Sequence, residues 1–368
     1  MTRISEGLLG QAVSMFSFRG PCSGVAPYGN GHINDTFLVC CRAGREMKRY
    51  ILQRINTLVF QNPEELMENI SHVTGFLHKK IEQAGGDPGR ETLNLIPSQT
   101  GRPYAIDPQG GYWRAYDFIE NTITLEHPRT ARDFYNSACS LGRFQLLLAD
   151  FPADTLHKTI PKFHNTPNRI DQFRAALDAD IKNRAASVKN EIRFVEEREP
   201  FTYTLTDLLK QKRLPLRVTH NDTKLNNILF DRDTGKGICL IDLDTVMPGL
   251  SVCDFGDSIR FGASTAAEDE RDLSKVHFDL DLFQIFTQGY LNAAGSVLTD
   301  AEKQNLPIGA KMMTLECGIR FLTDYLNGDT YFKTDREGQN LDRCRTQFRL
   351  VSEMEQKWTE MEHTAAYM

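Results

Sequence analysis

Several common signatures are missing from this sequence of 368 residues. No stretch approaches the ~20 consecutive apolar residues that cross a bilayer, and the N-terminal segment MTRISEGLLGQAVSMFSFRG has no long apolar core, so we expect neither a membrane span nor a signal peptide. There is no tail of like charge, and the net charge of −6 argues against a nucleic-acid partner. Internal repeats are also absent. The length then predicts two or three structural units, since one domain takes about 100–200 residues.

The eight cysteines include no C-x-x-C pair and lie mostly within apolar periodic segments. This pattern favours reduced, buried thiols in a cytoplasmic protein over a disulfide framework or a zinc site. One cysteine allows another interpretation, because Cys139-Ser140-Leu141-Gly142-Arg143 partly matches the C-x-P-x-R sequence that sulfatases modify. Its third residue is leucine in place of proline. A cysteine within a helical pattern is usually a small buried hydrophobe, which is the interpretation we favour.

The residues that can carry chemistry gather between Leu216 and Asp244. His220, Asp222, Lys224 and Asn227 have the spacing H-x-D-x-K-x-x-N, and an apolar run then delivers Asp242 fifteen residues after Asn227. Phosphoryl transfer requires a carboxylate at the acceptor hydroxyl and oxygen ligands for Mg²⁺. Asp222 fits the first role, and Asn227 with Asp242 fits the second. Lys224 can reach the γ-phosphate, and His220 is expected to buttress the loop.

An ordinary hairpin is the simplest alternative for this segment. Residues 218–219 and 228–230 have strand character, as does 237–241, and the intervening Asp233-Thr234-Gly235-Lys236 is a typical polar turn. Any one of the polar residues would fit such a hairpin. The full set, in this order and at these distances, favours the catalytic interpretation.

The segment resembles the catalytic loop of the aminoglycoside phosphotransferase and choline kinase superfamily. More narrowly, THNDTKLNNILFD, IDLDTVMPG and DFGDSIRFGA are similar to the N-acetylhexosamine 1-kinases. The resemblance implies an α+β, protein-kinase-like fold with two lobes, a small β-rich lobe over residues 1–118 and a large, mainly helical lobe over 119–368. It also implies that ATP and Mg²⁺ are used to phosphorylate the anomeric hydroxyl of GlcNAc or GalNAc. Two alternatives stay open: a kinase of the same superfamily that acts on another hexose, an aminoglycoside or choline, and a nucleotide-binding pseudokinase. We expect the protein to be a monomer.

A glycine-rich turn, Gly29-Asn30-Gly31, precedes an alternating apolar run. Such a turn lets backbone amides approach phosphates closely, although an ordinary hairpin is made in the same way. Because a kinase-type catalytic loop follows, we interpret Gly29 and Gly31 as nucleotide-binding. By the resemblance, His32 and Asn34 contact the sugar.

In this superfamily the next strand carries a cation that faces the α- and β-phosphates. The strand expected at 49–55 contains no lysine, so Arg54 is the candidate cation, with Gln53 beside it. On the helix expected at 63–80, Glu68 or Glu65 is the candidate partner. Each glutamate is equally a first-turn acid that the helix dipole favours.

The remaining site residues follow from the resemblance. Tyr116 and Phe118, on either side of Asp117, would lie beside adenine in the linker between the lobes. Phe261, Arg320 and Tyr331 would help to bind the sugar.

The triplet Asp254-Phe255-Gly256 imitates the metal-binding triplet of protein kinases, but Asp242 already stands at the expected distance from Asn227. We therefore expect Asp254 to brace the catalytic loop. Asp244 stays a candidate for a supporting or substrate-binding role.

Apolar periodicity predicts the secondary structure. Strands are expected at 49–55, 92–97 and 111–119. Helices are expected at 4–16, 63–80, 130–151, 169–188, 190–199, 203–210, 279–294, 308–326 and 342–363.

Overall fold

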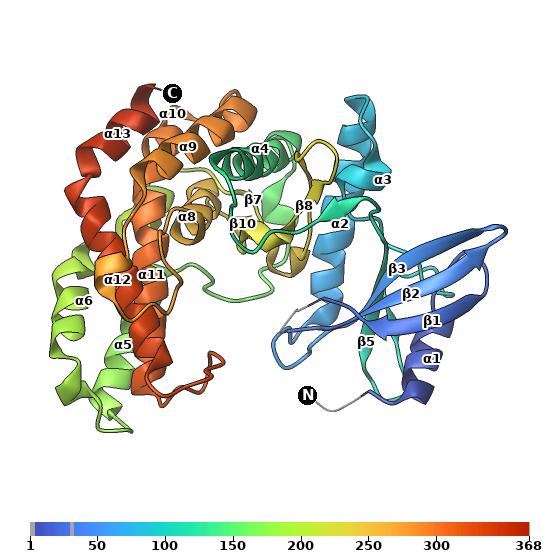
Figure 1. Ribbon diagram of the computed structural model, residues 1–368, viewed down its shortest axis with the longest axis horizontal. Coiled ribbons are helices and arrows are strands. Elements are labelled where there is room, and N and C mark those ends of the chain that lie inside the picture. The colour runs from blue at the N-terminus through green and yellow to red at the C-terminus, as the bar shows by residue number, and fades with distance from the viewer. Residues whose placement is uncertain (1–3, 30–32, 368) are drawn as a thin grey trace.

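The computed structural model describes residues 4–29 and 33–367 and shows two lobes (Figure 1). The smaller lobe, on the right of the figure, is built on an antiparallel sheet. The larger lobe, on the left, is mostly helical. This is the mixed α+β, two-lobed architecture that the sequence predicts.

The small lobe contains a five-stranded sheet in the order β1-β2-β3-β5-β4. Alternate residues of its strands point to opposite faces, as in any pleated sheet. One face, which includes Val39 and Leu52, packs on helix α1 (Glu6–Ser14). The strands are β1 (Cys22–Pro27), β2 (Asp35–Ala43), β3 (Glu46–Arg54), β4 (Ala105–Ile106) and β5 (Tyr112–Asp117).

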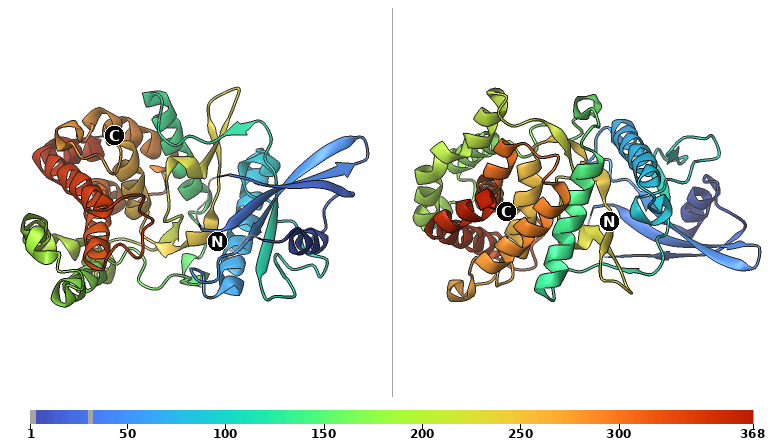
Figure 2. Two further views of the ribbon diagram at one scale, coloured as in Figure 1. Left: turned by 60° about the horizontal axis from the view of Figure 1, so that its bottom comes forward. Right: turned by 90° about the horizontal axis from the view of Figure 1, so that it is seen from above.

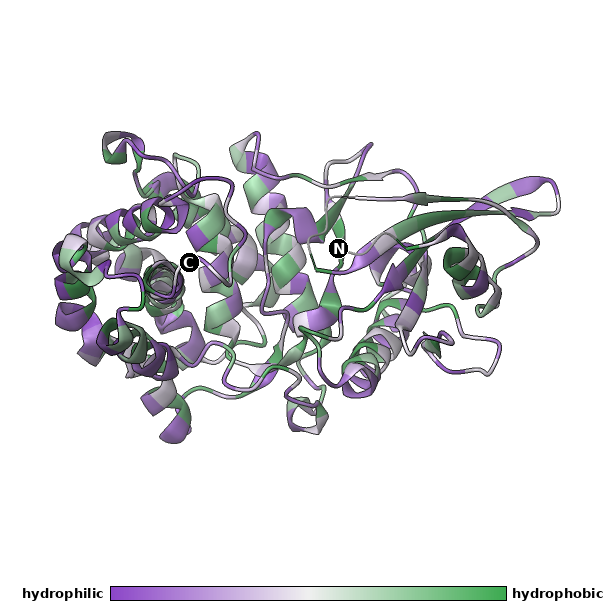
Figure 3. Ribbon diagram, turned by 90° about the horizontal axis from the view of Figure 1, so that it is seen from below, coloured by the Kyte–Doolittle hydropathy of each residue, from purple (hydrophilic) through white to green (hydrophobic). Residues whose placement is uncertain are grey.

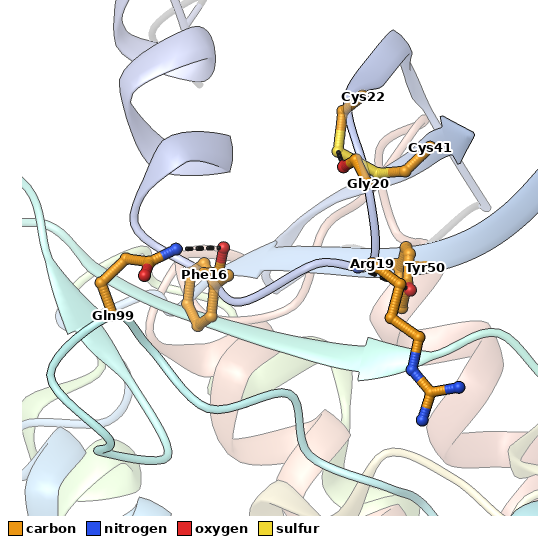
Figure 4. Close-up of a disulfide and its surroundings, with 7 residues drawn as sticks. All are labelled: Phe16, Arg19, Gly20, Cys22, Cys41, Tyr50 and Gln99. Atoms are coloured by element: carbon orange, nitrogen blue, oxygen red, sulfur yellow. Dashed lines mark hydrogen bonds between the residues drawn. A yellow bond between two sulfur atoms is a disulfide. The ribbon is translucent and has the colours of Figure 1, made fainter. Parts of the chain in front are cut away.

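A disulfide joins the first two strands, between Cys22 of β1 and Cys41 of β2 (Figure 4). The expectation that all cysteines are reduced is wrong for this pair. The two residues are nineteen positions apart in sequence but face each other across the β1–β2 ladder, a register that cysteine spacing does not reveal. The other six cysteines are free.

Helix α2 (Pro63–Gln83) lies between the sheet and the large lobe (Figures 1 and 2). Its apolar side, with Leu66, Ile70 and Val73, shares one core with Phe144 and Val246 of the large lobe. The two lobes are therefore joined by packed side chains as well as by the chain itself.

The segment after α2 differs from the prediction. Residues 92–97 form no strand; they follow the short helix α3 (Pro88–Glu91) and touch the sheet through an isolated bridge between Leu95 and Tyr116. The apolar character of this segment reflects burial of Leu93 and Ile96 rather than strand pairing.

Helices cover most of the large lobe, and each carries hydrophilic and hydrophobic stretches (Figure 3). The first, α4, begins with a capping box in which the side chains of Thr130 and Asp133 satisfy backbone N–H groups at the helix start. The α-helices are α4 (Ala131–Leu147), α5 (Thr166–Ala179), α6 (Lys189–Thr202), α7 (Thr204–Lys210), α8 (Ser251–Gly262), α9 (Leu280–Ala294), α10 (Asp300–Gln304), α11 (Leu306–Leu326), α12 (Gln339–Gln356) and α13 (Trp358–Tyr367).

Two helix predictions were too long. The helix expected at 169–188 ends at Ala179, where Asp180 adopts the left-handed conformation. The helix expected at 342–363 is divided into α12 and α13 around Lys357. In the described part of the chain, no helix has the length and apolarity to cross a membrane.

Candidate active site

The segment that the sequence marks as catalytic is both a hairpin and a loop. Strand β7 (Arg217–Thr219) pairs with β10 (Met247–Gly249), and β8 (Ile228–Asp231) pairs with β9 (Gly237–Leu240). The polar residues lie where these strands end. The hairpin interpretation and the catalytic one are therefore compatible, because the hairpin carries the chain from Asn227 back to Asp242.

Asp222 is the centre of this loop. Lys224 Nζ lies 2.8 Å from Asp222 Oδ1, and Asn227 Nδ2 donates to Asp222 Oδ2 at 3.0 Å and to its backbone oxygen at 2.9 Å. Burial opposes a charge on Lys224, but the neighbouring Asp222 carboxylate raises the lysine pKa. The arrangement holds an ionised carboxylate, partly open to solvent, beside a fixed positive charge.

Helix α8 braces the loop with two carboxylates. Asp254 accepts the backbone N–H groups of His220 at 2.8 Å and Asn221 at 2.7 Å, so the predicted bracing role of Asp254 is confirmed. Asp257 accepts the N–H of Thr223 at 3.1 Å. The two aspartates are three residues apart and so lie on the same side of the helix.

His220 supports the loop from within, as expected from the sequence. Its Nε2 lies 2.8 Å from the Ile241 carbonyl oxygen, to which it donates. Its Nδ1 accepts the N–H of Asp222 at 3.3 Å. The ring therefore links Asp222 to the residue that follows strand β9.

Asp242 adopts the left-handed conformation, with φ of 59°, which is uncommon outside glycine and found often at functional sites. Its side chain reaches solvent, yet protein atoms surround it on its other sides. Burial and the nearby carboxylates of Asp244 and Asp222 raise the pKa of Asp242 to about 6. A cation bound at Asp242 would relieve this repulsion between negative charges.

The donor set fits Mg²⁺ rather than a transition metal. Across 4–29 and 33–367, no three histidine, cysteine, aspartate or glutamate side chains form a metal-binding group. Asn227 directs its amide nitrogen at Asp222, so its Oδ1 faces away and can serve as a ligand with Asp242. One carboxylate and one amide oxygen suit a hard cation that keeps several positions for water and phosphate.

A buried ion pair joins the two lobes behind Asp242. Arg114 of β5 bonds Asp244, and both side chains are almost fully buried. Arg114 Nε also donates to Gln53 at 2.9 Å, and Asn34 Nδ2 donates to Asp244 at 2.6 Å. The sequence analysis missed Arg114. The sequence feature that could have identified Arg114 is a charged residue within the apolar strand YWRAYD, because a buried charge has to be paired.

The structure does not bring Arg54 to the site. Arg54 lies on the sheet face opposite to Gln53, beside Asp107 and over the ring of Trp113 at 6.0 Å. The reason is the strand pleat, which sends neighbouring residues to opposite faces. Gln53, the other candidate, points toward Arg114.

Neither of the two candidate glutamates of α2, Glu65 and Glu68, pairs with a cation of strand β3. Glu68 lies on the exposed side of the helix and contacts His157 at 2.7 Å. Glu65 accepts from Asn62 Nδ2 at 3.3 Å. Asn69, a buried polar residue of α2, donates to the carbonyl oxygens of His157 and Val246 at 2.8 and 3.0 Å.

Comparison with known proteins identifies the family. The model of the phosphotransferase enzyme family (APH) matches residues 24–283, which is most of the chain. The chain belongs to this phosphotransferase family. Cys139 lies within α4 and is partly buried, and burial raises the pKa of its thiol, which does not favour the reactive cysteine of a sulfatase.

Solved structures of similar fold are also phosphotransferases. An aminoglycoside phosphotransferase from Alicyclobacillus acidocaldarius has a TM-score of 0.61 at 13% identity, over 96% of each chain. Choline kinase from Cryptosporidium parvum has a TM-score of 0.56 at 15% identity, over 94% of this chain and 91% of that one. Spectinomycin phosphotransferase APH(9)-Ia, solved with ADP and spectinomycin, has a TM-score of 0.56 at 13% identity, over 98% and 100%. At these identities the likeness shows a shared protein-kinase-like fold.

The other residues predicted to bind the nucleotide come from the turn after β1 and from the end of β5 with the segment that follows it. Gly29 has a φ of +75°, which glycine adopts without strain, while Gly31 and His32 lie outside the described residues. Tyr116 is buried against Arg114, with its ring 5.5 Å away. Phe118 is partly exposed, edge-on to Tyr28 at 5.7 Å and stacked under Arg49 at 4.1 Å.

On the acceptor side, the predicted residues come from α8, α11 and the loop after α11. Phe261 stacks on His127 with ring centroids 5.4 Å apart. Arg320 lies 6.0 Å from the exposed ring of Tyr331. Within the described ranges, no carboxylate forms an ion pair with Arg320. Asn34, by contrast, is buried and uses its amide on Asp244 and on Asn56 N.

Proposed function

We propose that this protein is an ATP- and Mg²⁺-dependent kinase that transfers the γ-phosphoryl group to the anomeric hydroxyl of an N-acetylhexosamine, giving the sugar 1-phosphate. The observation that carries the proposal is the Asp222 carboxylate, held by Lys224 and Asn227 beside Asp242. This set meets the needs of phosphoryl transfer, which are positioning and charge stabilisation.

Each residue of the set has a distinct task. Asp222 orients the acceptor hydroxyl and takes its proton as the oxygen attacks the γ-phosphorus. Lys224 neutralises charge that develops on the phosphoryl oxygens. Asn227 and Asp242 would hold Mg²⁺, which when bound neutralises and orients the phosphates of ATP.

The two lobes divide the substrates between them. We assign nucleotide binding to residues 1–118, with Gly29 and Gly31 at the phosphates and Tyr116 and Phe118 near the base. Residues 119–368 would bind the acceptor, as a monomer. Arg54 and Glu68 lie away from Asp222 and Asp242, whereas Arg114 is a small-lobe cation whose charge acts on Asp242.

The acceptor site favours an uncharged sugar over a polycation. Arg320 carries a positive charge without a carboxylate ion-pair partner among the residues described. Burial and the nearby Arg320 lower the pKa of Arg169, so a second guanidinium lies close to the first. An aminoglycoside would be repelled by such a site. Arg320 with Phe261 and Tyr331 offers donors and aromatic faces, which suit the hydroxyl and acetamido groups of GlcNAc or GalNAc. His32 would complete the acceptor site.

The decisive experiment is ATP consumption with Mg²⁺ against free sugars, amino sugars, choline and aminoglycosides, followed by phosphorus NMR of the product. A sugar 1-phosphate from GlcNAc or GalNAc is the expected result. Turnover with another acceptor alone would keep the kinase and refute the sugar assignment. ATP binding without any turnover would favour a pseudokinase.

Replacing Arg320 with methionine should raise the acceptor KM by about tenfold or more, because one charge-assisted hydrogen bond contributes about 1.5–3 kcal/mol. The KM for ATP should stay within about twofold, since Arg320 is expected to touch only the acceptor. Steady-state kinetics with each substrate varied in turn measure both. Arg132→Met on the exposed start of α4 is the matched control. An unchanged acceptor KM would show that Arg320 does not bind the acceptor.

Activity should fall in acid, with a midpoint that depends on Mg²⁺. The Asp242 pKa of about 6 lies above the usual value, and a carboxylate has to lose its proton to bind a metal. At limiting Mg²⁺ the acid limb should therefore lie near pH 6, and raising Mg²⁺ should move it to lower pH. Rate profiles at several Mg²⁺ concentrations test this. If the midpoint of the acid limb does not change with Mg²⁺ concentration, the limb reports the titration of a group other than Asp242.

A further inference from the structure

We propose that His164 and Glu316 form a positioning pair that, together with His220, clamps the peptide bond leading into Asp222. The inference rests on the proposed function, because its purpose is to aim the Asp222 carboxylate. Neither residue was identified from the sequence, and both lie outside the conspicuous 216–244 segment.

The pair joins two distant parts of the large lobe to the catalytic loop. His164, just before α5, places Nδ1 3.1 Å from Glu316 Oε1 of α11 and Nε2 3.3 Å from the carbonyl oxygen of Asn221. Thr166 donates to the other Glu316 oxygen at 2.6 Å. Glu316 is 1% exposed, so its charge is paired entirely within the protein.

The Asn221–Asp222 peptide is thereby held on both sides. His164 donates to its carbonyl oxygen, and His220 Nδ1 accepts its N–H at 3.3 Å. Asn221 itself has a φ of 65°, and its side chain donates to the Thr245 carbonyl at 2.8 Å. A residue in the left-handed conformation persists when its surroundings fix it, and here nearly every polar group of Asn221 is used.

The two histidines have to be in different protonation states. A carbonyl oxygen and an ionised carboxylate can only accept, so both nitrogens of His164 carry protons and the ring is an imidazolium. His220 accepts with Nδ1 and donates to Ile241 with Nε2, so it is neutral. Geometry alone therefore assigns one charged and one uncharged histidine to this peptide.

The charges around His164 agree with this assignment. Burial opposes its charge, but Glu316 of α11 and Asp257 of α8 raise the pKa of His164, while Arg320 of α11 lowers it. Burial likewise opposes the charge of Glu316, yet the bond from His164, with a contribution from Arg169 of α5, lowers the Glu316 pKa to about 2. Both pKa shifts therefore favour the ionised form of the pair.

Loss of the His164 proton should release one side of the clamp. The proton that stays is the one shared with Glu316 at Nδ1, so Nε2 becomes an acceptor that faces the Asn221 oxygen. Because the folded pKa of His164 is raised, the clamp is intact below that pKa and is lost as the pH rises through it. We therefore expect a basic limb in kcat above the usual histidine pKa of about 6.5.

Three variants test the clamp. Glu316→Gln removes the charge that holds the His164 proton, so the basic limb should move down by about one pH unit or more, and kcat should be about tenfold lower at a pH above both limbs. In His164→Gln an amide can donate to the Asn221 oxygen without titrating, so kcat should be retained and the limb should disappear. His164→Ala should lower kcat about tenfold or more at every pH, as expected when a positioning contact is lost.

A matched control exists on the other side of the lobe. His277 also bonds a buried glutamate, with Nδ1 2.9 Å from Glu353 Oε1, but does not touch the catalytic loop. His277→Gln should leave the pH profile unchanged. The KM for ATP should stay within about twofold in all variants, because the clamp acts on Asp222 and not on nucleotide binding.

The readouts separate failure of the clamp from failure of the proposed function. Turnover is measured with whichever acceptor the substrate panel identifies and as ATP hydrolysis without acceptor, while histidine ring NMR follows the His164 titration directly. If Asp222→Asn lowers turnover but the His164 and Glu316 variants keep the wild-type profile, the clamp is refuted alone. If Asp222→Asn has no effect on turnover, the proposed function is refuted.

Discussion

Asp222→Asn should reduce turnover at least ~100-fold, because the variant has no carboxylate to take the proton of the acceptor hydroxyl. The amide is close in size to the carboxylate and can still accept the Asn227 bond, so the loop should keep its shape. ATP should bind with little change, since Asp222 acts on the acceptor. Steady-state kinetics measure kcat, and calorimetric titration measures the ATP affinity.

Asp233→Asn is the matched control for this variant. Asp233 lies in the exposed turn of the β8–β9 hairpin and accepts from Asn121 at 2.7 Å. It should leave kcat unchanged. Near-normal turnover of Asp222→Asn, measured beside this control, would show that Asp222 is not the base.

Arg114→Met should lower the free energy of unfolding by about 3–5 kcal/mol, because it leaves the Asp244 carboxylate buried without its cation. Asn34 would still donate to Asp244, but one neutral bond does not compensate a buried charge. Urea unfolding followed by circular dichroism measures the change. The double variant Arg114→Met with Asp244→Leu should be more stable than the single variant, since it removes both charges.

An exposed ion pair provides the comparison. Lys210 and Asp207 lie 3.1 Å apart on α7 with both side chains largely in solvent, and exposed pairs contribute less than about 1 kcal/mol. Lys210→Met should therefore change the urea midpoint only slightly. If Arg114→Met behaves like Lys210→Met, the pair between the lobes does not hold them together.

The arrangement of the candidate catalytic loop could be predicted because its information is local. The spacing of His220, Asp222 and Asn227 places them in one turn of chain, and Asp242 follows at the end of the next strand. The helices of the large lobe were similarly evident from apolar periodicity. The ends of some helices were predicted wrongly. At Asp180 the left-handed conformation ends a helix although the apolar pattern of the sequence continues.

The residues that support the loop could not be predicted, because they come from distant parts of the sequence. Arg114 meets Asp244 across 130 positions, and His164 meets Glu316 across 152. The face of a strand on which a residue lies also depends on register, which placed Arg54 away from the site. The pairing of Cys22 with Cys41 was hidden for the same reason.

The β8–β9 hairpin has a consequence for engineering the chain. Ile228 pairs with Leu240, and the Ile241 N–H donates to the Asn227 backbone oxygen at 2.9 Å. This strand pairing therefore fixes the relative position of Asn227 and Asp242. Residues added at the exposed tip, between Thr234 and Gly235, would lengthen the hairpin arm without altering this register. One residue added within 238–241 would turn the strand over and carry Asp242 to the wrong face. The tip is thus a permissive point for a genetically encoded label attached directly to the catalytic hairpin.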